Sequence, residues 1–338
     1  MHQPINKFVN QIICGGAHQV LKGFPDQSID CVVTSPPYWS LRDYGVKGQI
    51  GLESTFQEYI TRLCDMFDEV KRVLKQAGTC WVNLGDTYSS NHGGGNQVKV
   101  NAEVTPQLLP VGNPIRSREL QEKSLCQIPS RFAIEMTNRG WILRNEIIWS
   151  KPNALPAGAR DRFTVDFEKI FFFVKDKRYW FDLDSVREPQ NKKNIAEAIQ
   201  QAKAMGYSGK GSYQEWYFHQ RRKTDWLNGK RNLGFGMAAS RRLPKTRLVH
   251  PLGRAKRCVW SIPTKPFTGK HYAVYPPQLI ETPIKAGCPK GGIVLDPFMG
   301  SGTTALVARK LGRKFIGIDL KPAYVKMARA RLKEHPLH

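Results

Sequence analysis

The sequence has few cysteines and no long apolar run. The 7 cysteines among its 338 residues include no C-x-x-C pair, so we expect neither a zinc ribbon nor a disulfide framework, and a reducing compartment fits them best. No uninterrupted apolar run approaches the ~18 residues of a membrane span, so no membrane-spanning helix is expected. The start of the chain also lacks the apolar core of an export signal. These absences together predict a cytoplasmic protein.

Acidic residues are scarce relative to basic ones. The chain has 28 Asp and Glu against 52 Lys and Arg, which gives a formal net charge of +24. On a folded chain, such an excess favours a polyanionic partner, and nucleic acid is the first candidate. Hydrophobic residues make up 41% of the sequence, enough for a sizeable core in one large domain or two of ordinary size.

The positive charge is concentrated in residues 191–257. These 67 residues include 16 Lys and Arg but 3 Asp and Glu, so the stretch carries +13 of the net charge. Aromatic residues are interleaved with the basic clusters, and flat rings stack on bases or enter a groove while cations neutralise phosphates. A nucleic-acid-binding region is therefore predicted, with a solvated insertion around a small local core as the alternative. The predicted DNA-binding residues are Arg221, Arg222, Lys223, Lys230, Arg231, Arg241 and Arg242.

Expected strands and helices alternate on both sides of this stretch. Apolar β-branched runs predict strands, apolar residues spaced by three and four predict helices, and their alternation favours a parallel α/β sheet. Residues 86–123 are polar and glycine-rich and are expected to form a mobile loop. The expected strands are 29–33, 79–84, 142–149, 293–296 and 314–319, with a hairpin of 169–174 and 178–182. The expected helices are 17–23, 55–76, 128–139, 277–286, 303–311 and 322–333.

A glycine-rich turn near the C-terminus connects an expected strand with an expected helix. Gly300, Gly302 and Ala305 fit the pattern G-x-G-x-x-G/A, in which glycines allow a tight turn and the close approach of a ligand to the backbone. Asp319 ends the next expected strand, where a carboxylate accepts both hydroxyls of a ribose. No Lys follows Gly302, so the turn is not a phosphate-binding P-loop. An adenosine-type cofactor is indicated, with a ligand-free tight turn as the alternative.

Only two strands are expected after residue 293, too few for an open sheet. The remaining strands must come from upstream, so the order of the motifs looks circularly permuted. A dinucleotide-dependent oxidoreductase would also explain the glycine turn. Such enzymes usually begin with that turn, which makes an oxidoreductase the more distant alternative.

A double-proline turn follows the expected strand at residues 29–33. Its residues Ser35, Pro36, Pro37 and Tyr38 fall at the carboxyl end of the strand, the edge at which open α/β sheets place their chemistry. Two prolines make the turn rigid and orient the carbonyl before it. A hydroxyl, a carbonyl and a ring together suit an exocyclic amino group on a flat heterocycle. The alternative is an ordinary strand-ending turn with a buried Tyr.

Together the two turns resemble the β class of amino-group DNA methyltransferases that use S-adenosylmethionine. The proline turn Ser35–Tyr38 comes first and the segment Asp296–Gly302 comes last, as in that class. The resemblance covers nearly the whole chain and extends to segments 83–88, 148–153, 179–182 and 271–276. It implies an α/β fold with a Rossmann-like mixed sheet, helices on both faces, a circularly permuted motif order and a basic target-recognition insertion. The implied parts are 1–190 (catalytic), 191–257 (target recognition) and 258–338 (cofactor binding).

The resemblance also implies a role for each matching residue. Ser35, Pro36, Pro37 and Tyr38 would hold the target base, and Asp319 would bind the cofactor's ribose. The other implied cofactor-binding residues are Asp296, Phe298, Gly300, Gly302, Thr303, Tyr272 and Ala273. In one departure, Gly16 stands where many members have Asp, and a backbone group or Asp30 is the expected substitute. No metal is expected.

The activity implied by the resemblance is methyl transfer from S-adenosylmethionine to the exocyclic amino group of a base flipped out of double-stranded DNA. Acceptors at Ser35 and at the Pro36 carbonyl would draw both amino protons aside and aim the nitrogen lone pair at the methyl group. Among members of the family, Ser at the first motif position favours N4 of cytosine over N6 of adenine, which remains the alternative target.

Three other readings remain open beside DNA methylation. An RNA methyltransferase or a protein methyltransferase would carry the same motifs, and a DNA-binding module could retain the fold without activity. The expected partners are double-stranded DNA and a cognate restriction enzyme. The expected assembly is a monomer or a homodimer, encoded by a prokaryote or a phage.

Overall fold

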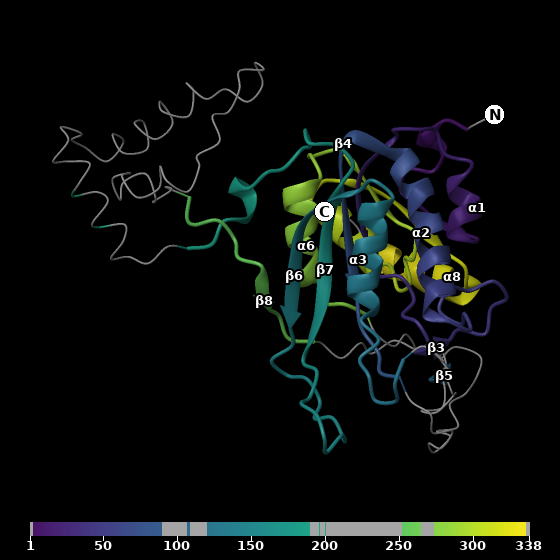
Figure 1. The fold of residues 1–338 in the computed structure, drawn as a ribbon. Coiled ribbons are helices and arrows are strands. Elements are labelled where there is room, and N and C mark those ends of the chain that lie inside the picture. The colour runs from purple at the N-terminus through teal and green to yellow at the C-terminus, as the bar shows by residue number, and fades with distance from the viewer. Residues whose placement is uncertain are drawn as a thin grey trace. The chain divides into compact units, whose positions relative to one another are not determined.

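The computed structural model divides into two compact units, Met1–Asp182 with Cys258–His338, and Leu183–Arg257. The first unit contains one large sheet with helices on both faces (Figure 1), which confirms the predicted α/β class. The structure describes residues 3–89, 107–108, 120–189, 196, 200, 252–264 and 274–335.

The large sheet has eight strands and mixed direction. In their order across the sheet they are β1 (Gln11–Cys14), β10 (Lys314–Asp319), β9 (Ile293–Asp296), β2 (Ile29–Thr34), β4 (Leu74–Leu84), β7 (Phe167–Val174), β6 (Ile142–Ser150) and β8 (Val259–Ser261). Strand β7 is antiparallel to both of its neighbours, and all other adjacent pairs are parallel. The carboxyl ends of the parallel strands and the amino end of β7 therefore meet at one edge.

The two strands from the end of the chain lie inside the sheet. Strands β9 and β10 lie between β1 and β2, so strands from upstream complete the sheet as predicted. A second, small sheet pairs β3 (Arg42–Asp43) with β5 (Gln107–Leu108).

Helices cover the two faces of the large sheet in two groups. One group packs α1 (Ala17–Leu21), α2 (Phe56–Val73) and α3 (Ile128–Asn138) against one another. The other joins α6 (Pro277–Gly287), α7 (Thr303–Lys310) and α8 (Pro322–Glu334). Single 3-10 turns form at η1 (Ile5–Lys7) and η2 (Asp184–Val186). Among the helices that the structure describes, none is long and apolar enough to cross a membrane.

The longest helix, α2, begins as its sequence predicts but ends early. Thr55 and Glu58 form a capping box, in which each side chain accepts the other residue's backbone N–H. The helix was expected to continue to residue 76, but it ends at Val73 because Leu74 already pairs with Ile29 in the sheet. Its apolar face is buried in the main core, which explains the strong helical spacing.

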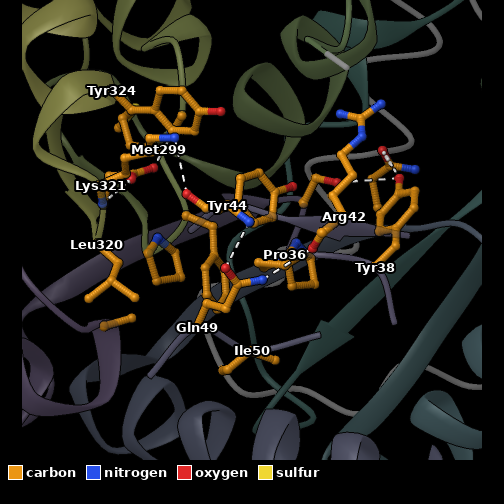
Figure 2. A pocket seen from close by; sticks show the side chains of 18 of the residues that line it. Pro36, Tyr38, Arg42, Tyr44, Gln49, Ile50, Met299, Leu320, Lys321 and Tyr324 are labelled. Atoms are coloured by element: carbon orange, nitrogen blue, oxygen red, sulfur yellow. Dashed lines mark hydrogen bonds between the residues drawn. The ribbon is translucent and has the colours of Figure 1, made fainter. Parts of the chain in front are cut away.

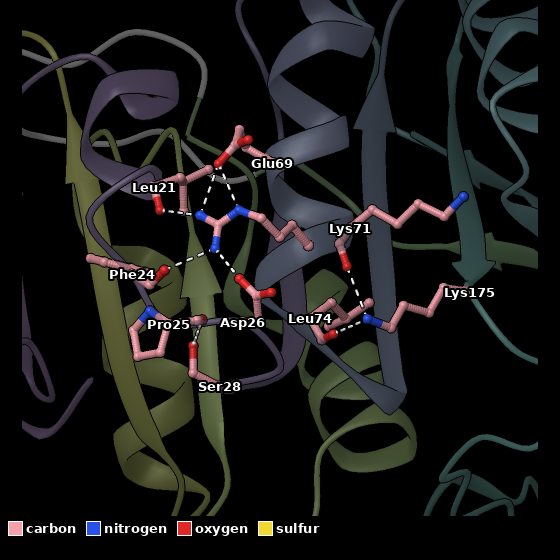
Figure 3. Close-up of polar contacts among 10 residues, drawn as sticks. Leu21, Phe24, Pro25, Asp26, Ser28, Glu69, Lys71, Leu74 and Lys175 are labelled. Carbon is pink, nitrogen blue, oxygen red and sulfur yellow. Dashed lines mark hydrogen bonds and ion pairs between the residues drawn. The ribbon is translucent and has the colours of Figure 1, made fainter. Parts of the chain in front are cut away.

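Two cations hold the carboxyl end of α2 in place (Figure 3). The guanidinium of Arg72 donates to the carbonyls of Leu21 and Phe24 and to the carboxylates of Asp26 and Glu69. These bonds join the last turn of α2 to the segment after α1, a connection that side-chain spacing alone does not reveal.

A second cation caps the carboxyl end of the same helix. The ammonium of Lys175 donates to the backbone carbonyl of Lys71 at 3.0 Å and to that of Leu74. Burial lowers the pKa of Lys175. A cation at this position satisfies carbonyls that have no partner within the helix.

The predicted hairpin of 169–174 and 178–182 is wrong in its second strand. Strand β7 forms, but its two edges are occupied by β4 and β6, so residues 178–182 have no free edge to pair with. That segment instead bonds to β4 and α6. The N–H of Trp180 donates to the carbonyl of Ala77, and the N–H of Asp182 donates to the carbonyl of Ala286.

The second unit, taken by itself, joins the residues just before the predicted recognition region 191–257 to residues near the end of that region. Glu188 and Arg254 exchange backbone hydrogen bonds of 2.9 and 2.8 Å, and their side chains form an ion pair. The guanidinium of Arg187 donates to the Gly253 carbonyl. Most of the predicted loop 86–123 lies outside the described residues, as do Tyr272, Ala273, Arg221, Arg222, Lys223, Lys230, Arg231, Arg241 and Arg242.

We predict that Gly287→Ala destabilises the fold, although alanine is the better helix former. A Cβ at Gly287 would meet the hydroxyl of Thr79 and lie 2.5 Å from Nε1 of Trp81 in the core. Overpacking costs about 1–3 kcal/mol, against a helix gain of at most about 1 kcal/mol, so a net loss of up to about 2 kcal/mol is expected. Urea unfolding measures it, with Gly158→Ala as the control because no atom lies within 4 Å of that position. Equal stabilities of the two variants would contradict the packing.

Candidate active site

Residues of both predicted turns line one cavity of about 650 Å³ at the carboxyl edge of the parallel strands. Ser35–Tyr38 follow β2, Pro297–Ser301 follow β9, and Asp319 ends β10. The volume lies within the usual range of small-molecule sites, about 300–1,000 Å³. The cavity in Figure 2 therefore joins motifs from opposite ends of the chain.

The carboxylate of Asp296 lies behind the cavity and connects the segments around it. It accepts hydrogen bonds from the hydroxyls of Thr34 at 2.6 Å, Tyr275 at 3.1 Å and Thr304 at 2.5 Å, and from the N–H of Phe298 at 3.0 Å. Asp296 is 1% exposed, and burial raises its pKa against the opposing hydrogen bonds of Thr304 and Thr34. Two protein donors reach each carboxylate oxygen, so the carboxylate holds neighbouring segments of the chain together. Asp296 is not among the residues that line the cavity.

The glycine turn has the conformation that its pattern predicts. Gly300 and Gly302 have φ angles of 52° and 85°, in the left-handed region that favours glycine. A Cβ at Gly302 would also lie 2.9 Å from the Cβ of Ala328 on α8. The turn therefore presents backbone to the cavity at Gly300 and packs against a helix at Gly302.

Asp319 faces the cavity at the end of β10. Its Oδ2 accepts from the N–H of Gly300 and its Oδ1 from the N–H of Lys321, both at 2.8 Å. Each carboxylate oxygen has two lone pairs, so each retains one acceptor position. Burial raises the pKa of Asp319 to about 6, against the two backbone hydrogen bonds.

Tyr38 of the proline turn is held from several sides. Its hydroxyl donates to the Glu168 carboxylate at 2.6 Å and lies 3.3 Å from Oδ1 of Asn83. The hydroxyl of Ser35 lies 3.4 Å away. Its ring packs on Gly85, where a Cβ would lie 2.5 Å from the ring carbon Cε2. Burial and the Glu168 charge raise the pKa of Tyr38, which keeps the phenol protonated.

Glu168 and Lys151 form an ion pair at the same end of the cavity. Glu168 is near the start of β7 and Lys151 directly follows β6, so the antiparallel turn of the chain brings them together. Sequence reasoning did not single out Glu168 as a site residue. The available signal was a charged residue at the start of an apolar strand, Phe167–Val174.

The segment after the proline turn closes one side of the cavity, which the sequence did not indicate (Figure 2). Lys321 donates from its ammonium to the Tyr44 carbonyl at 3.0 Å, and the rings of Tyr44 and Tyr324 meet edge to face. The side chain of Gln49 bonds to the backbone of Tyr44 and Arg42. These contacts connect the segment after the proline turn with α8 and the residue before it.

The expectation that Asp30 substitutes for an acid at Gly16 is wrong. Asp30 lies near the amino end of β2, away from the cavity edge, and accepts from the ammonium of Lys75 and the N–H of Ile293. Gly16 does line the cavity, and a Cβ there would meet no atom within 4 Å. The neighbouring side chains of His18 and Gln19 line the cavity beside it.

The structure thus gathers most of the predicted residues that it describes. Asp296 and Gly302 lie next to the cavity without lining it, and Tyr272 and Ala273 lie outside the described residues. Their neighbours Val274 and Tyr275 line the cavity. The predicted residues that line it are Ser35, Pro36, Pro37, Tyr38, Phe298, Gly300, Thr303 and Asp319.

The chain matches a known family over most of its length. The family model described as DNA methylase, for N6 and N4 enzymes, matches residues 29–330. Among similar proteins, type II methyltransferase M.SmaI of Serratia marcescens is 35% identical, over 95% of this chain and 90% of the relative. M.XycI of Xanthomonas campestris pv. cyanopsidis is 37% identical, over 94% of this chain and 86% of the relative.

Solved structures share the fold. A DNA modification methylase from Thermus thermophilus, solved with S-adenosyl-L-methionine, superposes with a TM-score of 0.55 at 23% identity, covering 98% of this chain and 96% of that one. The cytosine-N4-specific PvuII DNA methyltransferase has a TM-score of 0.55 at 20% identity, covering 97% of this chain and 87% of that one. This chain belongs to the N6/N4 DNA methylase family, whose methyl donor is S-adenosylmethionine.

We predict that Asp296→Asn destabilises the protein by about 1–3 kcal/mol, because an amide nitrogen cannot accept hydrogen bonds and leaves buried hydroxyls without a partner. Thermal unfolding of the variant measures this loss. Asp26→Asn is the matched control, because Asp26 pairs with Arg72 at the surface, where ion pairs contribute at most about 1 kcal/mol. An Asp296 variant as stable as the control would mean that the carboxylate does not hold the segments together.

Proposed function

We propose that this protein is a type II DNA methyltransferase that transfers a methyl group to N4 of a cytosine flipped out of duplex DNA. The observation that carries the proposal is the single cavity lined by the proline turn at one end and by the glycine turn and Asp319 at the other. A cofactor and a base placed at these two ends would meet inside one cavity. N6 of adenine is the alternative target.

The residues at the glycine-turn end fit the methyl donor. Asp319 keeps one acceptor position on each oxygen, which matches the two hydroxyls of a ribose. The backbone of Gly300 and the side chain of Phe298 would lie along the methionine and adenosine parts, and Thr303 would lie nearby. Asp296 would hold this turn in place instead of touching the cofactor, since four protein donors occupy its carboxylate. When bound, S-adenosylmethionine supplies an electrophilic methyl group.

The residues at the other end fit an aromatic amine. Ser35 and the Pro36 carbonyl would accept the two amino protons, which localises the nitrogen lone pair. Tyr38 would stack on the base, and the bond from its hydroxyl to Glu168 fixes its ring. The ammonium of Lys151 is a donor for a ring nitrogen or carbonyl of the base. Ser at position 35 favours cytosine, as in the family pattern.

Double-stranded DNA is the proposed substrate. The net charge of +24 and the +13 of residues 191–257 support a phosphate-binding surface, with Arg221, Arg222 and Lys223 as its first candidates. The similarity to type II methyltransferases supports a cognate restriction enzyme as a partner in the same cell.

The direct test is mass spectrometry of nucleosides from DNA of cells that express the chain. Methylation of cytosine at N4 is expected. Methylation of adenine at N6 would instead support the alternative target. A labelled-methyl assay on duplex DNA, RNA and protein identifies the substrate class. Transfer to RNA or protein but not to DNA would overturn the proposal.

Cofactor affinity should depend on pH through Asp319. The ionised carboxylate accepts both ribose hydroxyls, and its pKa of about 6 means that it gains a proton as the pH falls through that value. S-adenosylmethionine should therefore bind about tenfold more weakly at pH 5 than at pH 7, since about a tenth as much of the carboxyl is ionised one unit below the pKa as one unit above it. Calorimetry measures the affinities. Asp319→Asn should bind weakly at both pH values, whereas the control His18→Asn should retain the pH dependence.

Ser35→Ala should lower turnover while leaving cofactor affinity near that of the wild type. The hydroxyl would act on the target base, and by analogy with loss of one positioned hydrogen-bond donor at an active site, we expect a fall of about 10²–10³ in rate. Single-turnover methylation and cofactor titration separate the two effects. A parallel loss of cofactor affinity would show that the turn is structural.

A further inference from the structure

The loop between β6 and β7 begins and ends on the cavity. It leaves the sheet after Ser150 and rejoins it at Phe167, so that Lys151 and Glu168 form their ion pair beside Tyr38. Figure 1 shows the loop extending beyond the edge of the sheet at which these strands meet. Any duplex that delivered a base to Tyr38 would therefore pass close to this loop.

The loop is built to hold its shape. The N–H of Lys151 donates to the Asp166 carbonyl at 2.7 Å and closes its base. Near the tip, the N–H of Ala157 donates to the hydroxyl of Thr164. The guanidinium of Arg162 stacks on the ring of Tyr88, with its central carbon 3.5 Å from the ring centre. Two prolines, at positions 152 and 156, restrict the backbone further.

The loop nevertheless presents its large apolar side chains to solvent. Phe163 is 94% exposed and Leu155 is 88% exposed. Among the other large apolar residues that the structure describes, the most exposed is Val259, at 65%. Single exposed apolar residues are common, but two almost fully exposed apolar side chains on one internally hydrogen-bonded loop indicate a contact surface.

The charges around these two side chains suit DNA. Arg160 and Arg162 are exposed on either side of Asp161, which pairs with Lys123 at 2.8 Å. The loop thus offers an exposed ring that directly follows two exposed arginines in the chain, beside the cavity. Protein wedges that enter a base stack have the same combination of apolar tip and basic surroundings.

We propose that the β6–β7 loop is a wedge for duplex DNA, with Phe163 entering the stack at the target pair and Leu155 supporting it. The ring would occupy the gap left when the target base rotates toward Tyr38. This inference rests on the proposed function, because a wedge is needed only if the base leaves the duplex. It adds a surface that selects paired DNA and a reason why an apolar ring is left exposed.

The test compares methylation of two duplexes by the Phe163→Ala variant. In one duplex the target base is correctly paired, and in the other it is mispaired, so that little unstacking energy is needed. The variant should lose about 10- to 100-fold in single-turnover rate on the paired duplex and stay within about threefold of wild type on the mispaired one. Phe163→Trp, which keeps a flat ring, should retain the rate on both duplexes.

Two controls separate the wedge from other roles of the ring. Ile134→Ala removes a side chain that is 61% exposed on α3 and should change neither rate. Thermal unfolding and gel filtration should show that Phe163→Ala leaves stability and assembly state unchanged.

Each contrary outcome has a distinct meaning. An unchanged rate of Phe163→Ala on the paired duplex would overturn the wedge while leaving the proposed function intact. Equal losses on both duplexes, or a lower melting temperature, would place the ring in the catalytic pocket or the fold and would also overturn it. A changed assembly state would make the tip an interface between copies of the chain. No methylation of either duplex by the wild type would instead overturn the proposed function, and the wedge with it.

Discussion

The carboxylate of Asp296 is the interaction on which the rest of the site depends. Its four hydrogen bonds come from three separate parts of the chain: Thr34 before the proline turn, Tyr275 before α6, and Phe298 and Thr304 around the glycine turn. Thr34 is 262 residues away in sequence. A buried carboxylate with every acceptor position used is a rigid junction, because each donor left without a partner would carry a large desolvation penalty. The relative position of the two turns follows from this one group.

The reversed strand β7 supplies the second constraint. Parallel strands bring only their carboxyl ends to the site edge, whereas β7 brings its amino end. Glu168 thereby reaches Tyr38, and the connection from β6 becomes a loop that begins and ends beside the cavity. One change of strand direction thus accounts for an ion pair, for the anchoring of an aromatic ring and for the exposed apolar tip.

Much of the site follows from local patterns in the sequence. The proline turn and the glycine turn are each local patterns, since proline and glycine restrict or free the backbone at their own positions. Asp319 was found by its distance from Gly300 along one strand–helix–strand unit. Glu168 and the segment around Tyr44 were missed, because their role depends on contacts with residues distant in sequence. Asp30 was proposed for the cavity, but strand direction places it at the opposite end of β2.

The sequence by itself determined most of the central strands and helices, the two turns and the family, because these depend on spacing, on backbone restriction and on residue type within short segments. Only the tertiary structure decided which carboxylate is used up by hydrogen bonds within the protein and which faces the cavity. Asp296 and Asp319 both end strands, yet one meets four protein donors and the other keeps acceptor positions free. That difference comes from hydroxyls contributed by segments far apart in the chain, and packing alone brings them together.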